Sequence, residues 1–254
     1  MKMLNDQVIK NQWQAFCIAV QFLTQIPIRL KGYPDAKSQG QSLLYYPLVG
    51  VLIGAALLLL AWLLNGQSNL IQAVLVLILW VVLTGGLHLD GLADSADGWM
   101  GGLGDPQRTL AIMKDPCIGA IGSLTLILHL LLKYSALITL LAANHLLPVL
   151  VAPVVARVAA ILLLAITPYV SAQGIASAMV DNMPKQGIYL LAVSAVFLLA
   201  GLNIVWLVVV ATLFVLARRA MLLRINGTTG DTAGALIELL EAGVLIAACF
   251  TLEI

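Results

Sequence analysis

Long runs of apolar residues recur along the chain, and short segments rich in Gly, Pro, Ser, Asn, Asp and Lys separate them. A helix needs about 20 predominantly apolar residues to cross the roughly 30 Å hydrocarbon core of a bilayer. Gly201, Leu202 and Asn203 interrupt one long apolar stretch, so we divide it into two. The pattern predicts seven transmembrane helices, over residues 43–64, 70–87, 118–143, 146–166, 188–200, 203–216 and 233–252.

The first apolar stretch differs from these runs because glutamines are spaced along it. Within residues 10–29, Gln14, Gln21 and Gln25 lie at offsets that place them on one face of a helix. Such a segment is typical of an amphipathic helix in the membrane interface. We therefore predict an all-α fold: one integral membrane domain over residues 1–254, a polytopic transmembrane helical bundle of about seven spans with an N-terminal interfacial helix.

The composition excludes a water-soluble globule. Hydrophobic residues make up 61% of the chain and charged residues 10%, with a mean hydropathy of +1.03, against about 45–50% and about 25% in soluble domains. The net charge of +1 argues against nucleic acid as a partner, because binding the phosphate backbone needs an excess of basic residues. Cys17, Cys117 and Cys249 have no CxxC spacing, so they predict neither a disulfide framework nor a zinc site.

The Lys and Arg residues are distributed on one side of the predicted spans. If the N-terminus is cytoplasmic, they fall in cytoplasmic segments, the outer loops contain none, and only Lys133 and Arg157 lie within spans. Cytoplasmic loops carry the excess of Lys and Arg in membrane proteins. We therefore expect a multi-pass protein of the cell inner (cytoplasmic) membrane with its polar chemistry on the cytoplasmic side. Lys133 could pair within the bundle or extend to the interface.

A cluster of aspartates follows the second predicted span, in TGGLHLDGLADSADGWMGG. At about 100° per residue, Asp94 and Asp97 lie within about 40° of Asp90 around a helix axis. Neighbouring carboxylates repel one another, and each charge at membrane depth costs about 2.5–3.5 kcal/mol, so a divalent cation would relieve both penalties. Oxygen ligands without Cys or His favour magnesium or manganese, which bind one or two carboxylates plus substrate phosphates. His88 lies roughly 160° from Asp90, so we interpret it as structural.

A second acidic group lies in the last span, in NGTTGDTAGALIELLEAG. Asp231, Glu238 and Glu241 fall within an arc of about 80° on one helix. Glutamates inside an apolar span are costly unless they face the bundle interior and meet a cation or a basic partner. We expect these carboxylates to face the helix of Asp90, where they would serve either a metal site or an ion relay.

Basic residues and glycines near the acidic groups are candidates for binding phosphate. Arg108 and Lys114 follow the aspartate-rich segment. Arg157 lies inside a span, which predicts an acidic partner or an anionic ligand. Gly101 and Gly102 would let the backbone approach a phosphate, or they form a flexible turn.

Several of these motifs together resemble one enzyme family. The runs GGLHLDGLADSADG, IMKDPCIGAIG, TTGDTAGALIELLE, FLTQIPI, YYPLVGVLIG and MVDNMPK are similar to the cobalamin 5'-phosphate synthases, also called adenosylcobinamide-GDP ribazoletransferases, and occur in the same order. The resemblance extends over the chain. Gln25 stands where the family has Arg, and Pro116 where Ser is usual.

The resemblance implies a membrane-bound, magnesium-dependent enzyme. It would transfer alpha-ribazole or its 5'-phosphate to adenosylcobinamide-GDP, giving adenosylcobalamin or its 5'-phosphate and GMP. Such a phosphoryl transfer needs charge neutralisation and in-line positioning more than a covalent nucleophile. Together with the residue pattern, the resemblance assigns catalysis to Asp94 and Asp97, and Mg²⁺ to Asp90, Asp94 and Asp97. Asp231, Glu238 and Glu241 would complete the metal site or hold the ribazole. Substrate binding is assigned to Arg108, Lys114, Arg157, Gly101 and Gly102.

Two other functions remain alternatives at this point. Intramembrane aromatic prenyltransferases also use aspartate-rich motifs over magnesium and a diphosphate. An ion-coupled transporter would use intramembrane carboxylates as well, although no inverted repeat is evident. The CDP-alcohol phosphotransferases fit less well, because Asp94 and Ser95 occupy the Ala and Arg positions of their DGxxAR motif.

Overall fold

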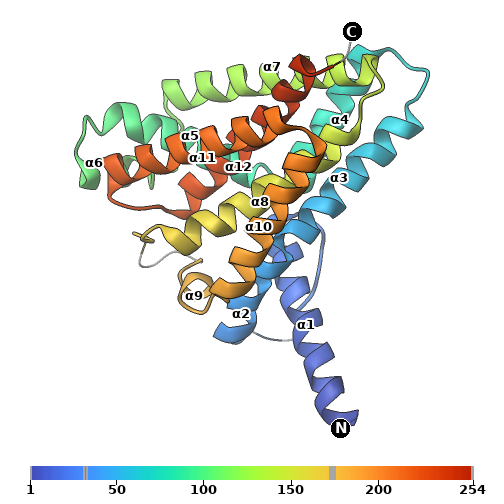
Figure 1. The fold of residues 1–254 in the computed structure, drawn as a ribbon. Coiled ribbons are helices and arrows are strands. Elements are labelled where there is room, and N and C mark those ends of the chain that lie inside the picture. The colour runs from blue at the N-terminus through green and yellow to red at the C-terminus, as the bar shows by residue number, and fades with distance from the viewer. Residues whose placement is uncertain (1, 31, 33, 172–175, 253–254) are drawn as a thin grey trace.

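The structure is a computed structural model that describes residues 2–30, 32, 34–171 and 176–252 (Figure 1). The regular elements in these ranges are helices, in the order α1 (Lys2–Leu23), α2 (Ala36–Ser42), η1 (Leu43–Tyr45), α3 (Tyr46–Leu63), α4 (Asn69–Thr84), α5 (Leu87–Gly101), α6 (Pro106–Ile112), α7 (Ala120–Ala142), α8 (Leu147–Ile166), α9 (Ser177–Asp181), α10 (Lys185–Leu202), α11 (Ile204–Ile225) and α12 (Gly230–Phe250).

The predicted all-α class is confirmed. In the described ranges, six helical segments are long and apolar enough to cross a membrane, and the number rises to seven if α4 and α5 together form one broken span. This agrees with the expected number of about seven. An isolated bridge between Tyr169 and Thr228 links the loop after α8 to the start of α12.

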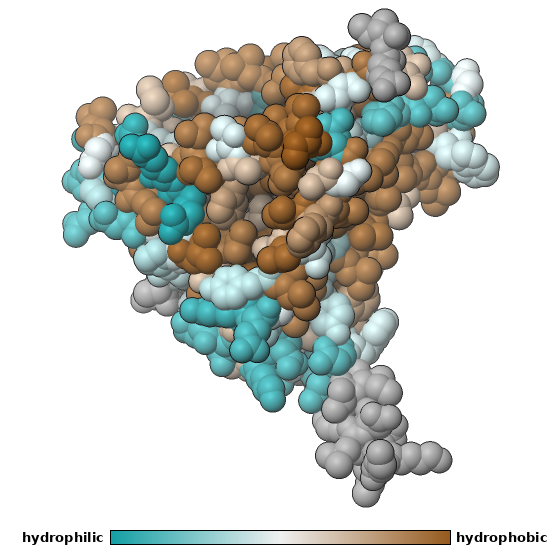
Figure 2. Space-filling view, in the orientation of Figure 1, coloured by the Kyte–Doolittle hydropathy of each residue, from teal (hydrophilic) through white to brown (hydrophobic). Residues whose placement is uncertain are grey.

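The surface has the distribution of side chains expected for a bilayer protein. Large apolar side chains point outward from the long helices, including Leu128 of α7 at 58% exposure and Phe197 of α10 at 74%. Figure 2 shows hydrophobic residues over the middle of the molecule, with hydrophilic residues gathered around α2 and α9 and, at the opposite end, around the turn between α3 and α4. Burying such a flank in lipid removes it from water.

The core forms around α8 and α12, the two spans with the largest buried share, 72% of each hydrophobic window. Helix α8 packs against α3 and α12, and α12 packs against α5, α7 and α11. Small residues allow these close approaches. A Cβ added to Gly50 of α3 would lie 2.7 Å from the carbonyl oxygen of Pro153 in α8.

The expected single span over residues 70–87 is broken in the structure. Helix α4 ends at Thr84, and α5 leaves it at an angle of 86°. Gly85 and Gly86 adopt left-handed φ angles of 63° and 70°, which side chains other than glycine rarely tolerate. The aspartate-rich helix is therefore a separate element that turns against α12 and α7.

The N-terminal helix ends earlier than the amphipathic segment predicted over residues 10–29. Helix α1 stops at Leu23, because Pro27 follows shortly and restricts the backbone. Its C-terminal half is buried against the bundle, whereas its beginning extends away from it (Figure 1). The segment after α1 reaches the break between α4 and α5, where the Gln25 N–H donates to the carbonyl oxygen of Leu83 at 2.8 Å.

Helices α10 and α11 divide the long apolar stretch at Asn203, the position of the interruption in the sequence. The Asn203 side chain accepts a hydrogen bond from the Val205 N–H at 2.9 Å and so caps α11. Helix α11 continues to Ile225, beyond the expected end at residue 216. It therefore carries Arg218 and Arg224 to the ends of neighbouring helices.

Candidate active site

A close crossing of α5 and α12 brings the two aspartate motifs together. A Cβ added to Gly91 would lie 2.5 Å from the carbonyl oxygen of Asp231 and 2.9 Å from its Cα. On the next turn, a Cβ on Gly234 would lie 3.3 Å from the Cα of His88. Glycine is required at the first of these positions, because any side chain would push the helices apart. The crossing places Asp231 beside the aspartates of α5.

Four carboxylates form a surface that we term the acidic face: Asp90, Asp94, Asp97 and Asp231. The charges of the other three all act on Asp94. Asp90 is exposed, and the others are partly exposed. Within the described residues, every salt bridge involves glutamates elsewhere, and none involves this face. Like charges about 6 Å apart repel by about 3 kcal/mol at an effective dielectric constant near 20, so the acidic face favours a bound cation.

The donor set of the acidic face fits magnesium only together with a substrate. In the part of the chain that the structure describes, no three His, Cys, Asp or Glu side chains are close enough to hold a metal by themselves. Magnesium usually binds through one or two carboxylates, substrate phosphates and waters. The face therefore suits an ion that arrives with a diphosphate better than a closed, all-protein metal site.

Asp97 has a second task, because it caps the N-terminus of α7. One carboxylate oxygen accepts the Gly119 N–H at 2.7 Å, and the other accepts the Gly122 N–H at 2.8 Å. A Cβ on either glycine would overlap the carboxylate. The two glycines of IMKDPCIGAIG therefore allow the start of α7 to pack closely against Asp97 of α5. Each oxygen keeps a lone pair, so Asp97 can still face a metal.

Glu238 and Glu241 do not join the acidic face. They lie in a group that we term the buried ion cluster, composed of His129 and Lys133 of α7, Arg157 of α8, and Glu238 and Glu241 of α12. The Lys133 Nζ lies 3.0 Å from Glu238 Oε2 and 2.7 Å from Glu241 Oε2. Arg157 Nη1 donates to Glu241, and His129 Nε2 lies 2.8 Å from Glu238 Oε2. Exposure of the five residues does not exceed 7%.

The buried ion cluster corrects three of the expected roles. Glu238 and Glu241 already have cationic partners, which argues against their service as magnesium ligands. Arg157 has the acidic partner that its position in a span predicted, rather than a substrate anion. Lys133 pairs inside the bundle, and it also lies 4.1 Å from the ring centroid of Trp80 in α4. The two positive charges of Lys133 and Arg157 equal in number the two negative charges of Glu238 and Glu241, so these ions can be buried together inside the bundle.

Sequence reasoning missed His129 as a member of this cluster and Trp80 as its aromatic neighbour. A usable signal was present, because the two basic residues inside spans, Lys133 and Arg157, equal in number the two glutamates inside the last span. Unpaired charges inside a bilayer are unfavourable, so such residues should be matched with one another before they are assigned to a ligand.

Helix α6 lies beside the acidic face. The residues expected to bind phosphate near this helix fall into two groups, exposed basic side chains and packed glycines. Arg108 and Lys114 are exposed near this helix. Gly101 and Gly102 pack against α6 instead of facing a ligand: a Cβ on Gly101 would lie 2.7 Å from the Cδ1 of Ile112, and Gly102 is buried. The two glycines therefore permit helix packing, and the basic side chains remain free for an anion.

Two arginines of α11 donate hydrogen bonds to groups at the C-terminal ends of other helices. Arg224 Nη1 donates to the carbonyl oxygen of Trp99 at 3.1 Å, near the end of α5. Arg218 donates to the carbonyl oxygen of Ile166 and the hydroxyl of Thr167, each at 3.0 Å, at the end of α8. Cations at helix C-termini are favourable, because the last carbonyl groups carry partial negative charge.

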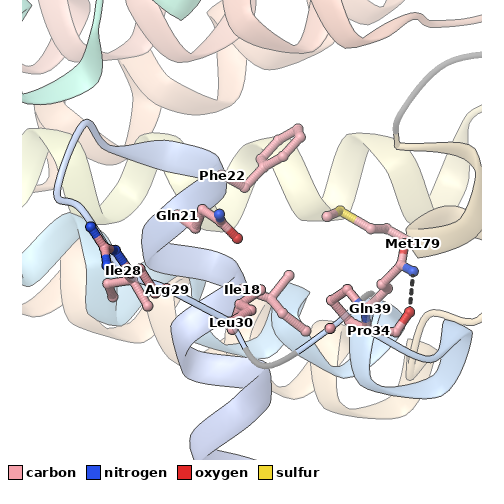
Figure 3. A pocket seen from close by; sticks show the side chains of 10 residues that line it. Ile18, Gln21, Phe22, Ile28, Arg29, Leu30, Pro34, Gln39 and Met179 are labelled. Atoms are coloured by element: carbon pink, nitrogen blue, oxygen red, sulfur yellow. Dashed lines mark hydrogen bonds between the residues drawn. The ribbon is translucent and has the colours of Figure 1, made fainter.

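Two cavities share part of their lining, and one of them reaches the acidic face. The outer cavity, of about 740 Å³, lies between α1, the segment after it and α2; Figure 3 shows Arg29 and Gln39 on opposite sides of it. The inner cavity, of about 230 Å³, extends to Asp231. Phe22 and Met179 line both cavities. Neither cavity was evident in the hydropathy pattern.

Comparisons with known proteins agree on one family. The family model described as cobalamin-5-phosphate synthase matches residues 15–249. An adenosylcobinamide-GDP ribazoletransferase of Stutzerimonas stutzeri (strain A1501) is 51% identical over 232 residues, which cover 90% of this chain and 95% of that protein. The protein of the same name from Ectopseudomonas mendocina (strain ymp) is 50% identical over 239 residues, 92% of this chain and 98% of that protein. No solved structure matches the chain.

Proposed function

Because the chain belongs to the cobalamin-5-phosphate synthase family, we propose that it acts as an adenosylcobinamide-GDP ribazoletransferase in cobalamin synthesis. The observation that carries the proposal is the identity of about half of all residues over nearly the full length of relatives with that name. The substrates are adenosylcobinamide-GDP and alpha-ribazole or its 5'-phosphate. The products are adenosylcobalamin or its 5'-phosphate and GMP.

The reaction is a phosphoryl transfer. The ribazole 3'-hydroxyl attacks the phosphorus bonded to the aminopropanol arm, a new phosphorus–oxygen bond forms, and the bond from that phosphorus to the bridging oxygen of GMP breaks. The hydroxyl loses its proton to a base. Catalysis of such a step depends on in-line alignment of the two oxygens and on control of the phosphate charge.

The acidic face supplies the groups that this chemistry needs. Asp90, Asp94 and Asp231 would hold magnesium together with the diphosphate, since all three carry unpaired charge at the crossing of α5 and α12. Bound magnesium would neutralise negative charge on the diphosphate. A carboxylate of the face that is not committed to the metal accepts the proton of the 3'-hydroxyl. Asp97 faces the same region, but it acts chiefly by holding α7 against α5.

Arg108 and Lys114 are the candidates for binding the phosphates of the leaving GMP. Their exposure near α6 leaves their side chains free to move toward an anion. Arginine can bind phosphate oxygens through two parallel hydrogen bonds, whereas lysine acts as a point charge. We no longer propose phosphate binding for Arg157, because it pairs with Glu241 in the buried ion cluster. The same holds for Gly101 and Gly102, because they pack against α6.

We also infer that the acidic face lies on the cytoplasmic side of the cell inner membrane, with the N-terminus on the same side. The turns at the opposite end of the bundle, at residues 64–68, 143–146 and 203, contain neither Lys nor Arg. Arg108, Lys114 and Lys185 lie at the end that carries the acidic face. This distribution supports the orientation through the preference of basic residues for the cytoplasm.

A reconstituted reaction tests the function. Protein purified in detergent receives magnesium, adenosylcobinamide-GDP and alpha-ribazole 5'-phosphate, and we expect release of GMP and a corrinoid with a nucleotide loop, both identified by mass spectrometry. Chelation of magnesium should stop the reaction. Pyrophosphate release from a prenyl diphosphate and an aromatic acceptor, or ion-dependent uptake into vesicles without a cobalamin product, would contradict the proposal.

A further inference from the structure

We propose that the inner cavity binds the planar base of the nucleoside acceptor, and that its residues select which base enters the product. This inference rests on the proposed function and assigns a part of the substrate to a part of the site. It is carried by three features of the cavity: its size and apolar lining, an unpartnered nitrogen of His88, and its continuity with Asp231.

The size and lining of the cavity suit one bicyclic ring. Its volume of about 230 Å³ is below the roughly 300–1,000 Å³ of pockets that hold drug-sized ligands. Leu43, Ala160 and Ile237 contribute apolar surface. Phe22 and Tyr46, stacked with ring centroids 6.2 Å apart and an interplanar angle of 22°, add aromatic surface. The base of alpha-ribazole is a dimethylated benzimidazole. It is flat and mostly apolar, so its shape and polarity match this cavity.

His88 supplies one polar atom to this apolar surface. The residue is 3% exposed and lines the cavity, and its Nδ1 is buried without a hydrogen-bond partner among the described residues. A buried unsatisfied polar group is unfavourable by about 1–3 kcal/mol, so a partner on a ligand is expected. The sequence pattern indicated only a structural histidine; the structure places the residue in the cavity lining with one ring nitrogen unpartnered among the described residues.

One hydrogen-bonding atom distinguishes the candidate occupants. A benzimidazole attached to ribose has a single free ring nitrogen, which accepts a hydrogen bond, and His88 can donate to it in the tautomer protonated at Nδ1. Guanine, the other base in the reaction, carries several donors and acceptors. Most of them would remain unpaired against Leu43, Ala160 and Ile237, which is strongly unfavourable.

The position of Asp231 then explains how the base and the reacting hydroxyl are placed together. Asp231 belongs to the acidic face and also lines the cavity. Tyr169 and Ser171 line the cavity as well, so each can offer a hydroxyl group to the ribose. A base in the cavity leaves the ribose beside the carboxylates that bind the diphosphate.

Narrowing the cavity tests the assignment. Ala160→Leu adds three carbons to the wall contributed by α8, and we expect the KM for alpha-ribazole to rise about tenfold or more, with the KM for adenosylcobinamide-GDP unchanged. For the riboside of unsubstituted benzimidazole, the KM should rise less than for the dimethylated one. Ala211→Leu, in the exposed apolar groove between α8, α10 and α11, is the matched control and should change neither KM.

A second measurement addresses the hydrogen bond of His88. In the unmodified enzyme, an acceptor with C–H in place of the free ring nitrogen should show a kcat/KM about tenfold or more below that of alpha-ribazole. In His88→Leu, the two acceptors should be used equally. An active enzyme with the same discrimination in His88→Leu, or a KM in Ala160→Leu that rises for adenosylcobinamide-GDP alone, would overturn the cavity assignment. Failure of the unmodified protein to form any corrinoid product would instead contradict the proposed function.

Discussion

Removal of one carboxylate from the buried ion cluster is the most demanding test of the structure. In Glu241→Gln, Arg157 loses its anionic partner and Lys133 loses one of two. The amide has nearly the same volume as the carboxylate, so the change removes charge without creating a cavity. The fully buried Arg157 already has its Nε and Nη2 unpartnered among the described residues, so it has no other anion to meet.

The magnitude follows from the burial of the partners. Glu241 and Arg157 are each 0% exposed, and Lys133 is 2% exposed. Removing one partner of a buried ion pair typically lowers the free energy of unfolding by about 3–5 kcal/mol, because the other charge remains uncompensated. Removing both charges in Glu241→Gln with Arg157→Met restores neutrality. We therefore expect the double variant to lose less free energy of unfolding than the two single variants lose together, by up to about 3 kcal/mol.

The assay is equilibrium unfolding of the purified protein in mild detergent, with Asp231→Asn as the control. This control makes the same carboxylate-to-amide change on the same helix, but Asp231 has no salt bridge in the described structure. It should change the free energy of unfolding by less than about 1 kcal/mol. Equal stability of Glu241→Gln and the unmodified protein, or strict additivity in the double variant, would refute the assignment of Glu241 to a structural ion pair.

Three further outcomes are expected. Asp94→Asn should insert and fold normally but lose most GMP release, because it removes the central charge of the acidic face; full turnover at ordinary magnesium would contradict that role. Gly91→Ala should lower activity strongly, since the new Cβ would meet the backbone of Asp231; an active variant with unchanged stability would show that the close helix crossing is unnecessary. In a cysteine-free protein, exposed Gln107→Cys should react with an impermeant maleimide only in inverted vesicles and exposed Gln67→Cys only in intact cells; the reverse pattern would overturn the orientation.

The number of spans and the aspartate-rich face could be predicted from local sequence alone. Long apolar runs reflect the thickness of the bilayer. The offsets between Asp90, Asp94 and Asp97 reflect the turn of a single helix. Both features depend on residues near one another in the chain, so the pattern contains what is needed to recognise them.

The partners of the second acidic group could not be predicted in the same way. Glu238 and Glu241 share an arc with Asp231, but Glu238 lies about 10 Å further along the helix axis. At that depth they meet Lys133 and Arg157, which come from helices α7 and α8. The angle of a residue around its helix axis does not report its depth in the bilayer or the helices next to it. Comparing these angles alone therefore groups all three carboxylates in one site.

The packing roles of several glycines could not be predicted either, because their neighbours in space are distant in sequence. Gly101 and Gly102 pack against α6, whereas Gly91 permits the crossing with α12 that assembles the acidic face. The break at Gly85 and Gly86 depends on left-handed backbone angles, which a hydropathy pattern does not report. A pair of consecutive glycines inside a predicted span is nevertheless a signal for such a break.

The division between a functional acidic face and a structural ion cluster is tested most directly by the magnesium dependence of GMP release. The same reaction is titrated with magnesium for Asp231→Asn and Glu238→Gln, two carboxylate-to-amide changes on α12 separated by about 10 Å. We expect Asp231→Asn to need a much higher magnesium concentration or to be inactive, and folded Glu238→Gln to keep the magnesium requirement of the unmodified enzyme. A raised requirement in Glu238→Gln together with an unchanged one in Asp231→Asn would contradict the division.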